Sequence, residues 1–383
     1  MLYFSIFLLV ISIFFSLITL WVFVGWIPYI SDYASIIASF FSAYLHIVSI
    51  IIFIGALALF LQQKSWLQTI IVLISIANII GTLIPIFAVF KVSQDLWTNI
   101  SLLKNLDVVL NRSQPDTSKS VVYHEVDGKK LHMDISPSTQ SESKNKALVL
   151  IHWGWFIAWE RWEEPVWTEY FTKRGYTVFD VWYRLANPQY HTYNKAATDI
   201  NTALVWINNN ASQYNLDMDS LVIVGSSAGA SLALQASYGW ESIFPAEIQW
   251  ELPVVQKIIA LFPATDMEAL WNLDTDFIWI NSREVWRKYV GGSPEEFPNE
   301  YDMINSAKLA KLWAPETLVI HGLADTLIPS ETLSPLKQKL DVIGTKNTFV
   351  YIPYAVHGYT YFENTLGFQI TRQLVSEFLN IEK

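Results

Sequence analysis

The chain has 383 residues, of which 52% are hydrophobic, with a formal net charge of −10 and no cysteine. This negative balance disfavours nucleic-acid binding, which needs a basic face, and the lack of cysteine excludes disulfide bonds. No zinc-protease motif, cysteine pair or phosphate-binding loop occurs, so the sequence predicts neither a metal nor a nucleotide cofactor.

The first quarter of the chain has the composition of a membrane region. Residues 1–92 carry three formal charges, Asp32, Lys64 and Lys91. The apolar stretches between them each exceed the ~20 residues that a helix needs to cross the hydrocarbon core. We therefore predict three transmembrane helices, at about residues 2–26, 35–62 and 66–91. A cleaved signal peptide followed by two spans is the alternative, although no basic segment precedes the first stretch.

Other residues of this region bear on its placement. Aromatic residues lie near the expected helix ends, as in an interfacial belt: Trp21, Trp26, Tyr29, Tyr33 and Trp66.

His46 lies in mid-span, where an ionisable group is a functional hypothesis by default. Because no other ionisable group lies near it in sequence, a neutral imidazole that hydrogen-bonds between helices is the favoured interpretation. Lys64 flanks one side of the membrane and Lys91, Lys104 and Arg112 the other, a small bias toward a cytoplasmic catalytic domain that leaves the sidedness open.

A linker over residues 93–118 follows the membrane region. Apolar residues recur at helical spacing between Gln94 and Arg112, which predicts an amphipathic helix. Such a helix would lie on the bilayer surface or dock on the domain that follows.

Residues 119–383 have the pattern of an α/β domain. Strand-like and helix-like segments alternate from Ala147 onward, which predicts a mostly parallel central sheet flanked by helices. An aromatic-rich stretch around residues 240–300 predicts a cap-like insertion over the active-site edge. Its aromatic side chains would wall an acyl or aromatic group, although packing of the cap onto the core would explain most of them: Trp240, Phe244, Trp250, Trp271, Phe277, Trp279 and Trp286.

A candidate oxyanion loop follows the first buried strand of this domain. Residues 147–151 are apolar and run into His152-Trp153-Gly154-Trp155. Glycine-rich loops at this position aim backbone N–H groups at a carbonyl oxygen. We expect the N–H groups of Gly154 and Trp155, with that of Ala228, to form an oxyanion hole. The alternative is that the aromatic residues of this loop only pack in the core.

The most informative motif is Gly225-Ser226-Ser227-Ala228-Gly229. An apolar strand-like run precedes it and a helix-like run follows it, which is the context of a nucleophile elbow. The tight turn requires small residues at Gly225 and Gly229, and it places the hydroxyl of Ser227 at a helix N-terminus. A structural strand-to-helix turn would read the same way, so the pentapeptide needs partners.

Those partners occur downstream in the order serine, acid, histidine. Asp325 follows one strand-like run and His357 follows the next, so both fall at the sheet edge where ligands bind in α/β folds. Taken singly, Asp325 is also a plausible helix cap and His357 a plausible loop histidine. His321 is the main rival base, but it precedes the acid. The coincidence of all three residues in one order favours a Ser227-His357-Asp325 triad.

These motifs resemble the α/β-hydrolase family. The closest branch is that of hormone-sensitive-lipase-like and bacterial feruloyl-esterase-like (BD-FAE) carboxylesterases. Segments that carry the resemblance are 123–131, 180–186, the helix with Asp199, and 291–296. The resemblance implies the triad named above and an α/β-hydrolase fold. The chain departs from the family by placing tryptophan at two glycine positions of the oxyanion loop and Ala230 where a further glycine is common.

The function expected from these observations is a membrane-anchored serine hydrolase that cleaves carboxylic esters, lipase-like or carboxylesterase-like, through an acyl-enzyme. Its partners would be the bilayer and a small-molecule or lipid ester. A serine peptidase or amidase on the same fold is one alternative. A catalytically degenerate membrane binding module, favoured by the altered oxyanion loop, is the other.

Overall fold

The computed structural model describes residues 2–24, 28–108, 119–140, 145–158, 164–277 and 280–381. The chain divides into two compact units. We call residues 1–110, 322–326 and 352–383 the helical unit, and residues 111–321 and 327–351 the sheet unit.

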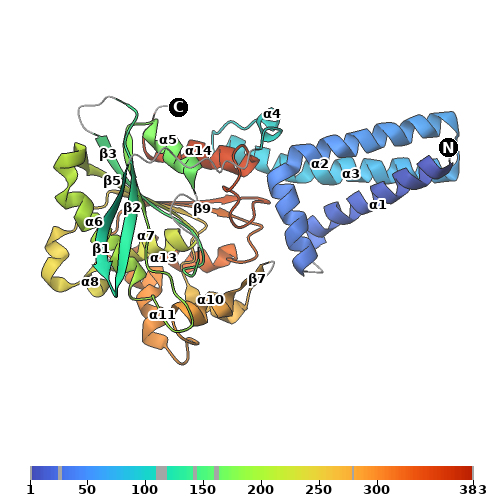
Figure 1. Cartoon of the computed structure of the whole chain (residues 1–383). Helices are drawn as coiled ribbons and strands as arrows, with labels where there is room; N and C mark the ends of the chain where they lie inside the picture. Colours follow the sequence, from blue (N-terminus) through green and yellow to red (C-terminus); the bar gives the residue numbers. More distant parts are fainter. Residues whose placement is uncertain are drawn as a thin grey trace. The chain divides into compact units, whose positions relative to one another are not determined.

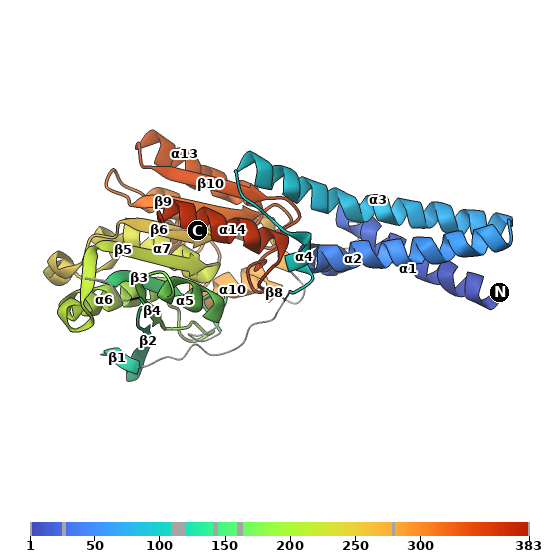
Figure 2. The same cartoon turned by 90° about the horizontal axis from the view of Figure 1, so that it is seen from above.

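Three long helices dominate the helical unit (Figure 1). They are α1 (Leu2–Val24), α2 (Pro28–Gln62) and α3 (Trp66–Asp95), and α2 and α3 run side by side in both views (Figure 2). All three are long and apolar enough to cross a membrane, as predicted. Helix α2 begins before the predicted residue 35 and has a break at Phe41, where φ is −121° and ψ is 31°. Trp26, predicted near the first helix end, lies outside the described residues.

The three helices bury polar groups and expose apolar ones. Asn78 of α3 donates to the carbonyl of Ser12 at 3.0 Å and accepts from Ser16 at 2.8 Å. His46 Nδ1 lies 3.1 Å from the hydroxyl of Thr82, so the expected hydrogen bond between helices is present. The exposed side chains are large and apolar, among them Leu2, Phe4, Ile51, Ile54, Leu73 and Phe87. This arrangement, polar inside and apolar outside, is the one that suits lipid.

The predicted amphipathic linker helix is not continuous over residues 94–108, and the rest of the linker, 109–118, lies outside the described residues. Helix α3 ends at Asp95, and α4 spans only Leu102–Asn105. Ser93 and Thr98 exchange hydrogen bonds around Trp97, whose φ of 55° cannot continue a helix. The backbone of residues 99–101 is instead extended toward α14 (Leu366–Phe378). Two glutamine side chains of α14, Gln369 and Gln373, each donate to and accept from this backbone.

The sheet unit is built on an eight-stranded sheet in the order β1-β2-β4-β3-β5-β6-β9-β10 (Figure 2). The strands from β4 to β9 pair in parallel, and β1 and β2 are antiparallel. The central strands are apolar and fully buried because helices cover them. The strands are β1 (Lys119–Val126), β2 (Lys129–Ser136), β3 (Asn145–Ile151), β4 (Tyr176–Val181), β5 (Leu216–Ser226), β6 (Lys257–Leu261), β9 (Glu316–Gly322) and β10 (Asn347–Ile352).

Helices connect these strands, as the alternating pattern predicts. Helix α5 packs on β4, and α6 packs on α7, which lies against β5. The helices are α5 (Pro165–Thr172), α6 (Ala196–Asn209), α7 (Ala228–Tyr238), α8 (Trp240–Ile243), α9 (Met267–Leu273), α10 (Ser282–Tyr289), α11 (Pro298–Ile304), α12 (Ser306–Leu309) and α13 (Ser334–Val342). Short 3-10 helices span 211–214, 246–251 and 330–333, and β7 (Asp276–Phe277) pairs with β8 (Ile280–Asn281).

The predicted cap over residues 240–300 needs a correction. Residues 257–261 form β6, a central strand of the sheet, because their apolar side chains are buried between β5 and β9. The segment that leaves the sheet begins after β6 and carries α9 to α12.

Candidate active site

Ser227 lies between the end of β5 and the start of α7. Its φ of 51° and ψ of −117° fall outside the regions that serine normally adopts. The backbone N–H of Ser227 donates to the carbonyl of Leu261 at 2.8 Å, which ties the turn to β6. Strain held by surrounding structure is typical of functional sites, and this geometry is compatible with the predicted nucleophile elbow.

The two glycines of the elbow have no room for a side chain. A Cβ on Gly225 would lie 2.4 Å from the carbonyl oxygen of Gly229. A Cβ on Gly229 would lie 2.1 Å from the carbonyl oxygen of Ile151, at the end of β3. The close approach of three backbone segments therefore explains both glycines, and it brings α7 against the strand that leads to the candidate oxyanion loop.

The candidate oxyanion loop turns sharply after β3. Gly154, Trp155 and Phe156 all have positive φ, at 124°, 61° and 62°. The carbonyl of Gly154 accepts from the N–H groups of residues 157 and 158 at 3.0 and 2.9 Å. The Phe156 ring stacks on Tyr289 at 4.0 Å. Tertiary packing thus holds two aromatic residues in a conformation that glycine ordinarily supplies.

His152 supports this loop. It is buried, its ring stacks on Tyr183 at 4.5 Å, and its Nδ1 lies 2.6 Å from the carbonyl of Trp153. The hydroxyl of Tyr183 donates to the carbonyl of His152 at 3.2 Å. The sequence does not predict this role for Tyr183, because His152, its hydrogen-bond partner, lies 31 residues away on a different loop.

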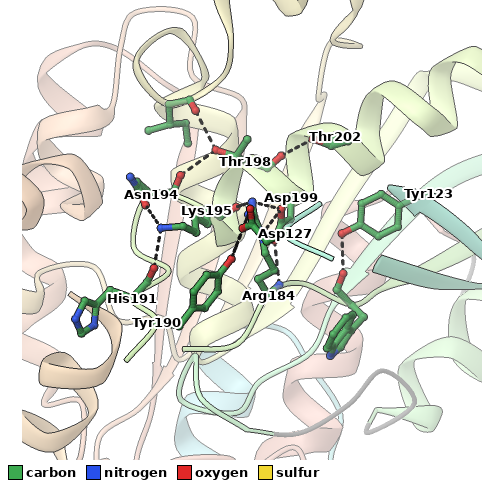
Figure 3. A network of polar contacts seen from close by, with 12 residues as sticks. Tyr123, Asp127, Arg184, Tyr190, His191, Asn194, Lys195, Thr198, Asp199 and Thr202 are labelled. Carbon is green, nitrogen blue, oxygen red and sulfur yellow. Dashed lines mark hydrogen bonds and ion pairs between the residues drawn. The ribbon is translucent and has the colours of Figure 1, made fainter. Parts of the chain in front are cut away.

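A buried ion pair anchors the segment after β4 (Figure 3). Arg184 donates through Nη2 and Nε to Asp199 of α6 at 2.6 and 2.9 Å, and through Nη1 to Asp127 at 2.8 Å. Burial opposes the charge of Arg184, but the hydrogen bonds and charge of Asp199 outweigh it and raise the pKa of Arg184. The motif around Arg184 is therefore structural: it joins α6 to the turn of the β1–β2 hairpin.

Asp127 is the exposed end of this network. Tyr190 donates to Asp127 at 2.5 Å, and Figure 3 shows both beside Arg184. These hydrogen bonds, first from Tyr190 and then from Arg184, lower the pKa of Asp127. The Asp-Gly turn singled out in the sequence is thus held by side chains as well as by backbone.

The predicted acid and base meet in the helical unit. Asp325 follows β9 and His357 follows β10, and both side chains are buried. His357 Nδ1 lies 2.7 Å from Asp325 Oδ2. Because an ionised carboxylate only accepts, the proton lies on Nδ1 and leaves Nε2 as the basic nitrogen.

Backbone contacts hold these two loops together. The N–H groups of Leu323 and Ala324 donate to the carbonyls of Ile352 and Ala355, each at 2.9 Å. A Cβ on Gly322 would lie 2.2 Å from the carbonyl oxygen of Ala355, so only glycine permits this approach. The acid and base loops therefore form one folded piece.

The rival base His321 has a different role. It is fully buried in the sheet unit, and its Nε2 lies 2.8 Å from the carbonyl of Ile328. Its imidazole is thus a core hydrogen-bonding group on β9, within the part of the chain that the structure describes.

A small cavity adjoins Ser227 and Ala228 in the sheet unit. Its volume is about 20 Å³, which is room for about one water molecule. Of the aromatic residues expected to wall the acyl group, Trp286 lines this cavity. Trp250 is 80% exposed, and Trp279 lies outside the described residues. The remaining lining residues are almost all apolar: Trp155, Phe156, Ala264, Leu270, Ser282, Val285, Leu327 and Ile328.

Known proteins are similar to parts of this chain in sequence and in fold. A curated relative, esterase LipC of Mycobacterium tuberculosis, is 25% identical over 193 residues, which cover 49% of this chain and 46% of the relative. This chain therefore matches less than half the length of that relative.

Solved structures of esterase 2 from Thermogutta terrifontis match more of the chain. The propionate-bound form has a TM-score of 0.58 at 22% identity, and it covers 69% of this chain and 94% of its own. The form phosphonylated by sarin has a TM-score of 0.58 at 20% identity, with 70% and 97% covered. This likeness shows the fold. The BD-FAE family model matches residues 133–340, more than half of the sequence. The chain is therefore an α/β-hydrolase-fold protein that belongs to the BD-FAE family.

Proposed function

We propose that this protein is a serine carboxylesterase that acts at a membrane surface. The observation that carries the proposal is the strained elbow of Ser227, held between two glycines that admit no side chain. The Asp325–His357 pair, with its basic Nε2, supplies the partner that a serine nucleophile requires. The names of the relatives, all esterases, support the same chemistry.

In the proposed mechanism Ser227 attacks the ester carbonyl. His357 accepts the serine proton at Nε2 and then delivers it to the leaving alcohol, while Asp325 stabilises the imidazolium. Backbone N–H groups of Gly154, Trp155 and Ala228 stabilise the tetrahedral oxyanion. Ala228 is the first residue of α7, so its N–H has no partner within the helix. A water molecule, activated by His357, then hydrolyses the acyl-enzyme and regenerates Ser227.

The small cavity beside Ser227 favours a short acyl group. Its volume of about 20 Å³ accommodates a methyl or ethyl end rather than a fatty chain. Propionate and butyrate are bound in the structures of the Thermogutta esterase, which is consistent with this preference. We therefore expect esters of short acids to be the better substrates.

The three long helices support the proposed membrane anchoring. Their outward side chains are apolar and would otherwise face water, whereas polar groups are paired inside. We expect alkaline carbonate to leave the protein in the membrane fraction, and release into the soluble fraction would contradict anchoring.

The decisive experiment is active-site labelling. Purified full-length protein and its Ser227→Ala variant are treated with a fluorophosphonate probe and then assayed with 4-nitrophenyl acetate and its anilide counterpart. We expect labelling and ester hydrolysis by the wild type, with both abolished in the variant. Equal labelling of both proteins would remove Ser227 as nucleophile, and faster cleavage of the anilide would favour an amidase.

A further inference from the structure

The residues that follow β9 and β10 belong to the same compact unit as the three long helices. Residues 322–326, which contain the acid, and residues 352–383, which contain the base, group with residues 1–110. The family match ends at residue 340, so it includes neither the helices nor His357. The contacts between the long helices and these two segments therefore involve residues outside the family match.

One of these contacts reaches the acid turn from α2. The hydroxyl of Thr326 donates to Oδ1 of Asp32 at 2.9 Å. Asp32 is 3% exposed and is one of three formal charges in the first 92 residues. Thr326 is the immediate neighbour of Asp325. Burying a carboxylate is costly unless it is hydrogen-bonded, so this contact constrains the turn that carries the acid.

A second contact joins the same helix to the loop between β10 and α14, residues 353–365, which carries His357 and which we call the base loop. The ring of Phe362, five residues beyond His357, packs against Phe40 at 4.7 Å and against Phe41 at 6.0 Å. Phe41 is also the residue at which α2 departs from helical geometry. The base loop therefore packs against α2 at the residue where its helical geometry is interrupted.

Asn105 hydrogen-bonds to the backbone of α2 on both sides of this break and to the base loop. Its side-chain amide donates to the carbonyl of Phe40 at 3.2 Å and accepts from the N–H of Ala43 at 3.0 Å, on either side of the departure from helical geometry. The same amide lies 3.3 Å from the carbonyl of Asn364 in the base loop. Asn105 is fully buried. A single amide thus joins α2, the linker and the loop that follows His357.

The length of α2 leaves room for these contacts outside the hydrocarbon core. Its 35 residues extend ~52 Å at about 1.5 Å per residue, longer than the ~30 Å core. The segment after the break, from Ser42 to Gln62, is itself long enough for that core, so the segment from Pro28 to Phe41 need not lie within it. Asp32 and Phe40 both lie in this segment, where a carboxylate is far less costly than in mid-membrane.

We propose that the first part of α2 is a positioning element for the catalytic acid and base, with Asp32 as its positioning residue. Asp32 does not touch the reacting atoms; it holds Thr326, and through it Asp325, in register with His357. Phe40 and Phe41 hold the other loop. This inference rests on the proposed esterase function, and it makes the membrane helices part of the catalytic apparatus as well as an anchor.

The test uses full-length protein in lipid nanodiscs and compares removal of the contact with its conservation. Asp32→Ala and Thr326→Val remove the hydrogen bond, whereas Asp32→Asn and Thr326→Ser keep an acceptor and a donor. We expect the first pair to lower kcat for 4-nitrophenyl acetate by about 10- to 100-fold with KM within about twofold, since misplacement by about 1 Å costs on this scale. The second pair should retain most of kcat.

The double variant Asp32→Ala/Thr326→Val should be no slower than either single variant, because both remove one contact. Asp95→Ala, an exposed acid at the end of α3, is the matched control and should behave as wild type. Thermal unfolding checks that each variant folds, and Thr326→Val, a near-isosteric change, keeps the test valid if Asp32→Ala does not.

Two results would overturn the inference. One is wild-type kcat in folded Thr326→Val, and the other is an effect of Asp32→Ala that adds in full to that of Thr326→Val. Failure of the wild type to react with a fluorophosphonate at Ser227 would instead defeat the esterase proposal, so the two failures are distinguishable.

Discussion

His357 Nδ1 and Asp325 Oδ2 lie 2.7 Å apart, in two buried side chains that come from consecutive loops. The carboxylate fixes the tautomer that leaves Nε2 free of its proton. Asn at position 325 has nearly the same shape, but its amide can donate to Nδ1 and so favour the opposite tautomer. We expect Asp325→Asn to lower kcat by roughly 10⁴-fold, as loss of the tautomer does in other serine hydrolases.

This prediction is checked with 4-nitrophenyl acetate turnover, and the far-UV spectrum and melting temperature control for folding. Replacement of the rival base, His321→Gln, serves as comparison: it should affect stability more than turnover, because His321 is fully buried and its Nε2 contacts the carbonyl of Ile328. A variant Asp325→Asn with near wild-type kcat would contradict the assignment of the acid.

Leu270 closes the cavity beside Ser227, and its side chain is 1% exposed. Truncation to alanine should open room for a longer acyl chain. A methylene in an apolar pocket is worth about 1–3 kcal/mol, so Leu270→Ala should raise the octanoate-to-acetate ratio of kcat/KM by roughly tenfold or more. Leu273→Ala, on the same helix but 48% exposed, is the control. An unchanged ratio in Leu270→Ala would show that the acyl group binds elsewhere.

Gly229 lies where a Cβ would meet the carbonyl oxygens of Ile151 and His152 at 2.1 and 2.5 Å. These are backbone atoms, so relief of the clash must move β3 or α7. We expect Gly229→Ala to cost about 1–3 kcal/mol of stability and to abolish fluorophosphonate labelling. Gly55→Ala is the matched control, because its Cβ would lie 3.5 Å from Leu8, an ordinary contact. Labelling of Gly229→Ala at the wild-type rate would argue against the elbow.

Arg184 and Asp199 form a buried ion pair, with side chains 7% and 1% exposed. Removing one partner leaves an uncompensated charge, so Arg184→Met should cost about 3–5 kcal/mol in unfolding free energy. The double variant Arg184→Met/Asp199→Leu should recover much of that loss, because no buried charge remains. Arg283→Met, which breaks an exposed pair with Asp274, should cost about 1 kcal/mol or less. Chemical denaturation would measure all three, and equal losses in the single and double variants would refute this account.

The stability of the folded protein should depend on pH through Asp127, in a direction set by the shift of its pKa. Its pKa in the folded protein is lowered by the Tyr190 hydroxyl and by Arg184. Its stabilising effect is therefore present above the ordinary carboxyl pKa, which is about 4, and is lost as pH falls through the lower folded-state pKa. The melting temperature of Asp127→Asn should thus be below that of wild type at pH 7, and the difference should shrink below about pH 4. A difference that stays constant with pH would count against this ionic contribution.

Much of the fold could be predicted from local sequence. Apolar runs uninterrupted by charge predict the three long helices, because length and apolar composition together decide whether a helix can cross a bilayer. The elbow glycines predict the turn at Ser227, because no other residue fits beside Ile151. Helical spacing between Gln94 and Arg112 does not produce one continuous helix in the described residues, because hydrogen bonds between Ser93 and Thr98 end α3. The predicted cap wrongly included β6, because the five residues of this buried strand stand within an aromatic-rich stretch of sequence.

The sequence by itself determined the chemical identity of the candidate site, since a serine between two glycines, an acid and a histidine follow in one order at strand ends. Tertiary structure alone decided which side chains constrain them. The partner of Thr326 is 294 residues away in Asp32, and the cavity beside Ser227 is closed by helices α9 and α10. Periodicity and motif spacing carry information over one element, whereas contacts between distant elements depend on how the whole chain packs.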